Sequence, residues 1–148
     1  MSLYLRQANI SDAEQILEWR NDPVTRANSF NGDPIDLETH LKWFERKLSD
    51  DRCRMYVLTD GNKDLGFIRL DIEDASAEIS YMIAPAFRGH GYGREIIRLI
   101  TLNTPGQIET LKAYTKEDNP VSGRCFISNG FTRSIEDGKV CYTKKCRT

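Results

Sequence analysis

The chain has 148 residues, and its 21 basic side chains nearly balance its 22 acidic ones. That length suits a single domain with a modest core, spanning residues 1–148 without repeats or low-complexity linkers. The balanced charge lacks the basic field that non-specific nucleic-acid binding needs. No stretch approaches the ~20 apolar residues of a membrane span, and the N-terminus lacks the apolar core of a signal peptide. We therefore expect a cytoplasmic protein without nucleic-acid or membrane partners.

The first third of the chain predicts one strand and two helices. Leu3–Ala8 alternates apolar and polar residues as a strand does, and Ser11–Glu14 has the spacing of a capping box that opens a helix. Asn21-Asp22-Pro23 predicts the end of that helix, because the residue before a proline avoids the helical conformation. Residues 24–34 are expected to form a loop. A second helix is expected from Asp36, with apolar residues at helical spacing: Leu37, Leu41, Phe44 and Leu48.

The middle of the chain predicts three consecutive strands. Arg54–Thr59 and Leu65–Asp71 are joined around Asp60-Gly61-Asn62, which is a hairpin signal. Asp74-Ala75-Ser76 makes the next turn, into a strand over residues 77–84. A glycine-rich segment follows, and then a helix-like run over residues 94–102.

The C-terminal third predicts a fifth strand at Ile108–Thr115 and a short helix at Pro120–Asn129 that Gly130 closes. A final hairpin is then expected, with strands at Phe131–Ile135 and Lys139–Lys145 and a turn at Asp137-Gly138. The complete order is β-α-α-β-β-β-α-β-α-β-β. This order predicts an α/β protein, with a mixed sheet and helices on both of its faces.

The segment Arg88-Gly89-His90-Gly91-Tyr92-Gly93 lies between the fourth strand and the helix that follows it. Glycines lack a Cβ, so their backbone N–H groups can approach an anion, and the following helix points its positive end at the same place. The flanking Arg88 and Arg94 can add charge-assisted contacts. A plain glycine-rich loop is the alternative, and the spacing matches neither the NTPase P-loop nor the dinucleotide fingerprint. We expect a diphosphate cradle of the kind that coenzyme A requires.

This order of elements, with the glycine turn after the fourth strand, resembles the GNAT superfamily of acyl-CoA-dependent N-acetyltransferases. Pro85 just before the glycines, Asn119 after the fifth strand and Asn129-Gly130-Phe131 at the end of the last helix fit the same family. The resemblance covers nearly the whole chain. It implies a twisted mixed sheet of about seven strands, acetyl-CoA as acetyl donor and no metal.

The resemblance also assigns residues to the coenzyme. Tyr81, Met82 and Ile83 would pair by backbone with the pantetheine arm, the glycine turn would hold the pyrophosphate, and Asn119 would contact the coenzyme near the pantetheine. Tyr81 and Ile83 as core residues, and Asn119-Pro120 as a helix start, are the alternatives. The implied coenzyme-binding set is Tyr81, Met82, Ile83, Arg88, Gly89, His90, Gly91, Tyr92, Gly93, Arg94 and Asn119.

Two motifs in the N-terminal half concern the acceptor. Leu17–Pro23 and His40–Phe44 resemble the branch that acetylates amino sugars on nucleotide carriers, such as the pseudaminic-acid pathway enzymes. Similar pieces occur in acetyltransferases that act on ribosomal-protein N-termini. The resemblance implies that Arg20 grips a nucleotide phosphate and that His40 bonds a sugar hydroxyl or a nearby phosphate. The alternative places the aromatic residues in the core and Arg20 beneath the carbonyls of a helix end.

Acetyl transfer to an amine needs a base, and Glu78 on the fourth strand is the best candidate. Strand alternation puts Glu78 and Tyr81 on opposite faces, and the sequence leaves open which face lines the cleft, so Tyr81 competes for acceptor contact. Many relatives place a proton-donating tyrosine seven residues after the asparagine, where this chain has Phe126. Tyr114 on the fifth strand is the candidate that replaces it.

The sequence therefore predicts an acetyl-CoA-dependent N-acetyltransferase with a small amine acceptor, a nucleotide-linked amino sugar, in a monomer or homodimer. The alternatives are a peptide or ribosomal-protein Nα-acetyltransferase and a coenzyme-binding GNAT-like domain that has lost turnover.

Overall fold

A computed structural model describes residues 2–146 of the chain. The strands are β1 Tyr4–Gln7, β2 Cys53–Thr59, β3 Asp64–Glu73, β4 Ser76–Ile83, β5 Thr110–Thr115, β6 Thr132–Glu136 and β7 Lys139–Lys145. The α-helices are α1 Ala13–Arg20, α2 Pro23–Asn28, α3 Leu37–Leu48, α4 Tyr92–Leu102 and α5 Pro120–Ile127, and the short 3-10 turns are η1 Ile10–Asp12 and η2 Pro85–Phe87.

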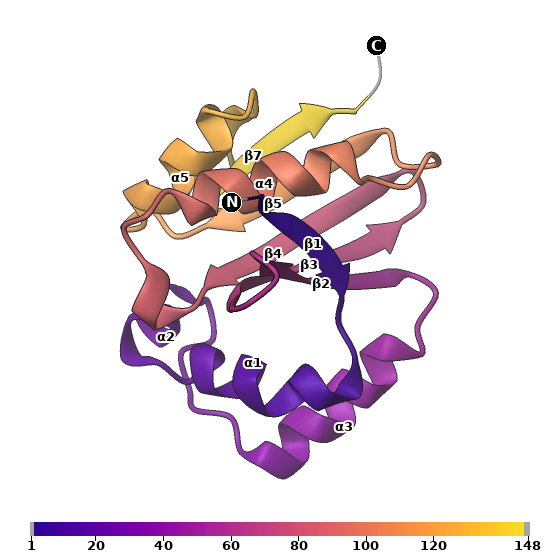
Figure 1. Cartoon of the computed structure of the whole chain (residues 1–148). Coiled ribbons are helices and arrows are strands. Elements are labelled where there is room, and N and C mark those ends of the chain that lie inside the picture. The colour runs from indigo at the N-terminus through magenta and orange to yellow at the C-terminus, as the bar shows by residue number, and fades with distance from the viewer. Residues whose placement is uncertain (1, 147–148) are drawn as a thin grey trace.

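All seven strands form one mixed sheet in the order β1-β2-β3-β4-β5-β7-β6. Neighbouring strands are antiparallel except β4 and β5, which are parallel because α4 crosses over between them. Figure 1 shows α4 and α5 on one face of the sheet and α1 and α3 on the other. The predicted α/β class, with about seven strands and helices on both faces, is confirmed.

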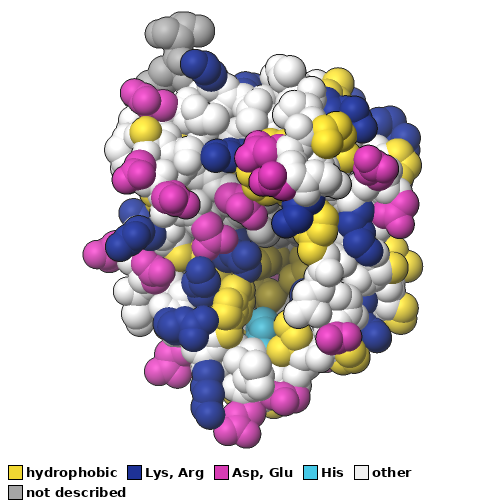
Figure 2. All heavy atoms as spheres, turned by 180° about the vertical axis from the view of Figure 1, so that it is seen from behind, with side chains coloured by type: hydrophobic (Ala, Val, Ile, Leu, Met, Phe, Trp, Pro, Cys, Tyr) yellow, Lys and Arg dark blue, Asp and Glu magenta, His cyan; other side chains and the backbone are white. Residues whose placement is uncertain are grey.

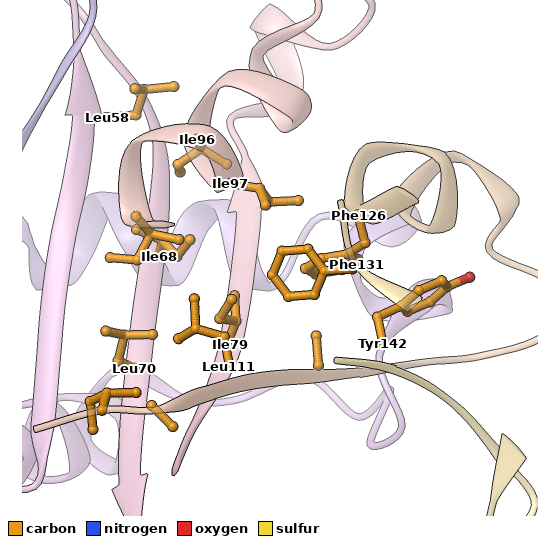
Figure 3. Close-up of a cluster of buried hydrophobic side chains, with 14 of the residues drawn as sticks. Leu58, Ile68, Leu70, Ile79, Ile96, Ile97, Leu111, Phe126, Phe131 and Tyr142 are labelled. Carbon is orange, nitrogen blue, oxygen red and sulfur yellow. The ribbon is translucent and has the colours of Figure 1, made fainter. Parts of the chain in front are cut away.

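Each face of the sheet carries its own core. Under α4 and α5, aliphatic side chains of β3, β4 and β5 pack against a group of aromatic rings, and Figure 3 shows the rings of Phe126, Phe131 and Tyr142 side by side. On the other face, Ala13, Ile16 and Phe44 pack against β2 and β3.

Within residues 2–146, no helix is long and apolar enough to cross a membrane.

The prediction of a loop over residues 24–34 is wrong at its start, because residues 23–28 form α2. The Asp22 carboxylate accepts hydrogen bonds from the N–H groups of Val24 and Thr25, and Pro23 occupies the first helical position, where a missing N–H costs nothing. Asp-Pro is therefore a helix start here as well as the end of α1.

The capping box predicted at Ser11–Glu14 lies two residues earlier. The Asn9 side chain accepts from the Ser11 N–H, the Asp12 carboxylate accepts from the Asn9 N–H, and the pair opens η1 rather than α1 directly. The fourth helix also begins earlier than predicted, at Tyr92 instead of Arg94, so the glycine turn includes the first helical residues.

Candidate active site

The parallel strands β4 and β5 pair at one end and separate at the other, and we call the opening between them the fork. They pair at three positions, from Ser76 with Thr110 to Glu78 with Lys112. Beyond that point β4 continues through residues 79–83 and β5 through residues 113–115 without pairing to each other. Backbone groups of a strand alternate between its two neighbours, so β4 presents unpaired groups to the fork. An extended ligand can add there as a strand would.

The glycine turn follows β4 at the open end of the fork. Gly89 and Gly91 have φ values of 81° and 80°, in the left-handed region that favours glycine. Gly91 is the N-cap of α4, and no other group lies within 4 Å of where a Cβ on either glycine would be. Within residues 2–146, none of the backbone N–H groups from Arg88 to Arg94 donates a hydrogen bond. A helix start, free amides and open space are together the features that an anion cradle requires.

The third glycine of the turn serves packing. A Cβ at Gly93 would lie 3.0 Å from the Cys125 Sγ and 3.7 Å from the Tyr81 ring, so glycine lets the first turn of α4 approach α5. His90 is exposed and its ring stacks on Tyr92 at 5.7 Å between centroids. Arg94 is also exposed.

Arg88, expected at the coenzyme, has partners within the protein. Its Nη2 donates to the Asp22 carboxylate at 2.6 Å and to the Thr25 hydroxyl at 2.8 Å. The hydrogen bond from Arg88 is the main reason that the pKa of Asp22 lies below its ordinary value. The glycine turn is thus tied to the start of α2.

Asn119, the expected coenzyme residue after β5, is the N-cap of α5. Its side-chain oxygen accepts from the Ser122 N–H at 3.4 Å, and it lies at the edge of a groove of ≈ 570 Å³ beside α5. The helix-start interpretation is therefore correct for this residue. It does not compete with coenzyme binding, because the amide nitrogen of the side chain is not used in the cap.

The structure settles which face of β4 carries which side chains. Ile79, Tyr81 and Ile83 belong to the core under α4 and α5, whereas Met82 packs with the core under α1 and α3. Glu78 shares the face of Met82 and is exposed. The Tyr81 hydroxyl bonds the Ser122 hydroxyl at 2.9 Å, so its side chain faces α5, on the opposite side of the sheet from Glu78.

Leu111 and Ala113 of β5 face the core under α4 and α5. Because side chains alternate along a strand, Tyr114 lies on the opposite face of the sheet, which is the face that carries Glu78. Its hydroxyl donates to the Glu136 carboxylate at 3.4 Å. Desolvation, with contributions from Cys141, Glu136 and Glu78, raises the pKa of Tyr114 to about 12. The phenol therefore keeps its proton at neutral pH.

Phe126 occupies the position where many relatives have a tyrosine. The side chain is only 1% exposed, and its ring centroid lies 5.1 Å from that of Phe131 and 5.3 Å from that of Tyr142. It is a core residue without chemistry of its own.

Arg20 and His40, which the sequence assigns to the acceptor, carry buried nitrogens without partners. Nη2 of Arg20 donates to the Asn31 carbonyl at 2.6 Å, but Nη1 is buried and has no hydrogen-bond partner in residues 2–146. The His40 side chain, 4% exposed in all, likewise has no partner for Nε2 there. More than nine-tenths of buried polar groups in proteins are paired, so two orphans so close are unusual.

The pKa values of Arg20 and His40 are both lower than the ordinary values of these side chains. Burial lowers the pKa of His40 below its ordinary 6.5, and the charge of Arg20 lowers it further. A hydrogen bond with the Ala13 backbone acts in the opposite direction and raises the pKa, but its effect is smaller than that of burial. Burial, and then Arg26, lower the pKa of Arg20, which remains a cation. The charge of Arg20 thus acts on His40.

The wall next to His40 includes contacts that the sequence did not suggest. The Arg69 guanidinium lies over the Trp43 ring at 5.0 Å and donates to the Asp71 carboxylate at 2.8 Å. The His40 and Trp43 rings stack at 5.8 Å. Figure 2 shows a hollow on one side of the molecule, with hydrophobic walls, a histidine inside it and charges of both signs at its rim. Spacing along the chain gives no signal for the contact between Arg69 of β3 and Trp43 of α3.

Comparison with known proteins gives a consistent result. Residues 2–132 match the family model described as acetyltransferase (GNAT) domain. The acetyltransferase PseH of Campylobacter jejuni subsp. jejuni serotype O:23/36 (strain 81-176) is 29% identical over 135 residues, which cover 88% of this chain and 83% of that protein.

Solved structures share the fold. Spermidine N-acetyltransferase from Vibrio cholerae, in complex with CoA and spermine, has a TM-score of 0.86 at 19% identity, over 97% of this chain and 95% of that one. RimL, a ribosomal L7/L12 alpha-N-protein acetyltransferase in complex with coenzyme A, has a TM-score of 0.84 at 18% identity, over 98% and 94%. The resemblance drawn from the glycine turn and its flanking motifs is confirmed.

Proposed function

The chain belongs to the GNAT acetyltransferase family and is an acetyl-CoA-dependent acyltransferase, and from this premise we propose that its acceptor is the amine of a nucleotide-linked amino sugar. The observation that carries the proposal is the pair of buried, unpartnered nitrogens on Arg20 and His40. A guanidinium with free N–H groups binds a phosphate better than any neutral ligand. An acceptor that carries both an amine and a phosphate would satisfy it.

His40 suits a hydroxyl group of the same acceptor. Its lowered pKa keeps the ring neutral at pH 7, and a neutral imidazole has one donor and one acceptor nitrogen. Because the backbone bond with Ala13 is not made by the unpartnered Nε2, Nδ1 is the donor and Nε2 accepts from a sugar O–H. Arg20 and His40 would then bind two parts of one ligand, its phosphate and a sugar hydroxyl.

The coenzyme would lie in the fork between β4 and β5. Unpaired backbone groups of residues 79–83 would bond the pantetheine arm, as the resemblance implies for Tyr81, Met82 and Ile83. The free amides of residues 88–94 would hold the diphosphate at the start of α4, with Asn119 on the opposite side of the fork. Of Tyr81, only the backbone enters this proposal, because its side chain faces α5.

Transfer would be direct. Glu78, where the fork opens, removes a proton from the acceptor ammonium, itself or through water, and the free amine attacks the thioester carbonyl. A backbone N–H of the fork stabilises the oxyanion of the tetrahedral intermediate. When this intermediate collapses, the C–S bond breaks, the thiolate leaves and the nitrogen gives its second proton to water, which leaves the neutral amide. A thiolate with a pKa near that of cysteine, about 8.5, can take its proton from water, so Phe126 does not prevent turnover.

The proposal is tested with acetyl-CoA and a panel of amines, with free thiol as the product measured. The panel contains UDP-linked amino sugars, the same amino sugars without a nucleotide and peptides with free N-termini. We expect the nucleotide-linked amines to give the highest kcat/KM. Highest turnover on the peptides would replace the proposal with Nα-acetylation.

A substitution links the activity to the site. Arg20→Ala should raise the KM for a nucleotide-linked amine by roughly 10- to 100-fold, since a hydrogen bond to a charged group contributes about 1.5–3 kcal/mol. The KM for the bare amino sugar should change little. Arg46→Ala, which removes an exposed cation of α3, is the matched control. Equal increases for both amines in Arg20→Ala would refute the phosphate contact.

A further inference from the structure

The short helix α2 is held at both ends by cations from the two arms of the fork. Arg88, which follows β4, donates to Asp22 at 2.6 Å and to Thr25 at 2.8 Å, at the start of the helix. Lys116, which follows β5, donates to the Ala27 carbonyl at 2.9 Å, in its last turn. Since Arg88 follows β4 by way of η2, Lys116 directly follows β5 and the two strands diverge, α2 bridges the open end of the fork.

The chain after α2 is held on the same side. Lys139 of β7 lies over the Phe30 ring at 4.7 Å and over the Tyr114 ring at 5.9 Å, which brings the segment after α2 to the face of β5 that carries Tyr114. Arg20 donates to the Asn31 carbonyl. The segment from residue 20 to residue 31 thus connects the open end of the fork with the unpartnered nitrogens near α1.

Arg88 keeps capacity for a second ligand. A guanidinium has five N–H donors in one plane, and the two protein contacts of Arg88 use Nη2 alone. Nε and Nη1 donate no hydrogen bond to residues 2–146, and Gly89 with its free amide comes next in the chain. One planar group can therefore bond an anion in the glycine turn while it still holds Asp22.

We propose that Arg88 and Lys116 are positioning residues that hold α2 across the fork, and that Arg88 couples the diphosphate of the coenzyme to the acceptor side of the site. The proposal rests on the proposed function only in placing coenzyme A in the fork. Diphosphate binding fixes the Arg88 guanidinium, which fixes Asp22 and the first turn of α2. Because coupling is reciprocal, an acceptor that orders α2 also tightens coenzyme binding.

Hydrogen–deuterium exchange with free coenzyme A as the probe tests the coupling without knowledge of the acceptor. In the wild-type protein, coenzyme A should slow exchange in residues 88–94 and also in α2, by about fivefold or more, the lower end of coupling between linked sites. If Arg88 instead leaves Asp22 for the diphosphate, exchange in α2 accelerates. Acceleration, or no change in α2 while residues 88–94 are protected, would overturn the proposal.

Asp22→Asn separates the ion pair from the helix cap. Asparagine caps a helix as well as aspartate does, so the variant keeps α2 and loses the charge that holds Arg88. Coenzyme A should still protect residues 88–94, which also shows that the variant is folded, but the protection of α2 should fall to less than about twofold. Protection of α2 at the wild-type level in Asp22→Asn would refute the role of the ion pair.

Two further variants complete the test. Lys116→Gln should likewise reduce the protection of α2, and Arg124→Gln, which removes an exposed cation of α5, should not. If Lys116→Gln leaves the protection of α2 intact, Lys116 has no part in positioning. Failure of the proposed function gives a different result: coenzyme A then protects residues 88–94 and α2, while no nucleotide-linked amine is acetylated.

Discussion

Replacement of Gly91 by alanine tests whether the glycine turn is shaped for an anion. Gly91 has φ 80° as the N-cap of α4, and a Cβ there would meet no other group within 4 Å. The cost of the substitution is therefore backbone strain alone. An L-residue in the left-handed conformation costs about 1–2 kcal/mol relative to glycine. For a chain of this length, such a loss lowers Tm by roughly 2–8 °C.

Gly138 provides the matched control. It has φ 77°, also with no group within 4 Å of a Cβ, but it lies in the turn between β6 and β7. Gly138→Ala should therefore lower Tm by a similar amount. Only Gly91→Ala should also raise the KM for acetyl-CoA, by about tenfold if ~1.4 kcal/mol of the strain is relieved by displacing the amides of the turn.

The assays are thermal unfolding of each variant and initial rates of thiol release at varied acetyl-CoA. Gly91→Asn should recover part of the lost stability, because asparagine tolerates the left-handed conformation better than alanine does. An unchanged KM for acetyl-CoA in Gly91→Ala, together with the same loss of Tm as in Gly138→Ala, would refute the assignment of the turn to the coenzyme.

Three further outcomes follow from the site and its packing. Glu78→Gln should lower kcat by at least about 10²-fold, the usual contribution of a general base, and near-normal turnover at every pH would remove Glu78 from the mechanism. Gly123→Ala would place a Cβ 2.3 Å from the Tyr142 hydroxyl and should lower the free energy of unfolding by about 1–3 kcal/mol in urea titrations. In a Tyr142→Phe background the same change should be nearly neutral, and an equal loss in both backgrounds would exclude this contact as the cause. Since the pKa of His40 is lowered in the folded state, the unfolded state binds the proton first, so the free energy of unfolding should fall as pH drops from about 7 to about 5.5. His40→Asn should remove that slope, and a slope that persists would assign it to other groups.

Features encoded in short stretches of sequence could be predicted. Alternation and helical spacing gave the order of strands and helices, because side-chain periodicity follows from local backbone geometry. The glycine turn was recognised because left-handed residues demand glycine, and Gly89 and Gly91 have positive φ. Boundaries follow less directly from local patterns. Asp22-Pro23 both ends α1 and starts α2, so the sequence predicts a loop where α2 forms.

The sequence by itself therefore determined the fold class, the family and the position of the glycine turn, since each follows from patterns of residues close together in the chain. Only the tertiary structure decided which face of β4 carries Glu78, because the helices that cover each face come from distant segments. The same holds for the unpartnered nitrogens of Arg20 and His40 and for the bond from Arg88 to Asp22, 66 residues apart in the chain. Burial and pairing are properties of packed neighbours, and no local pattern specifies them.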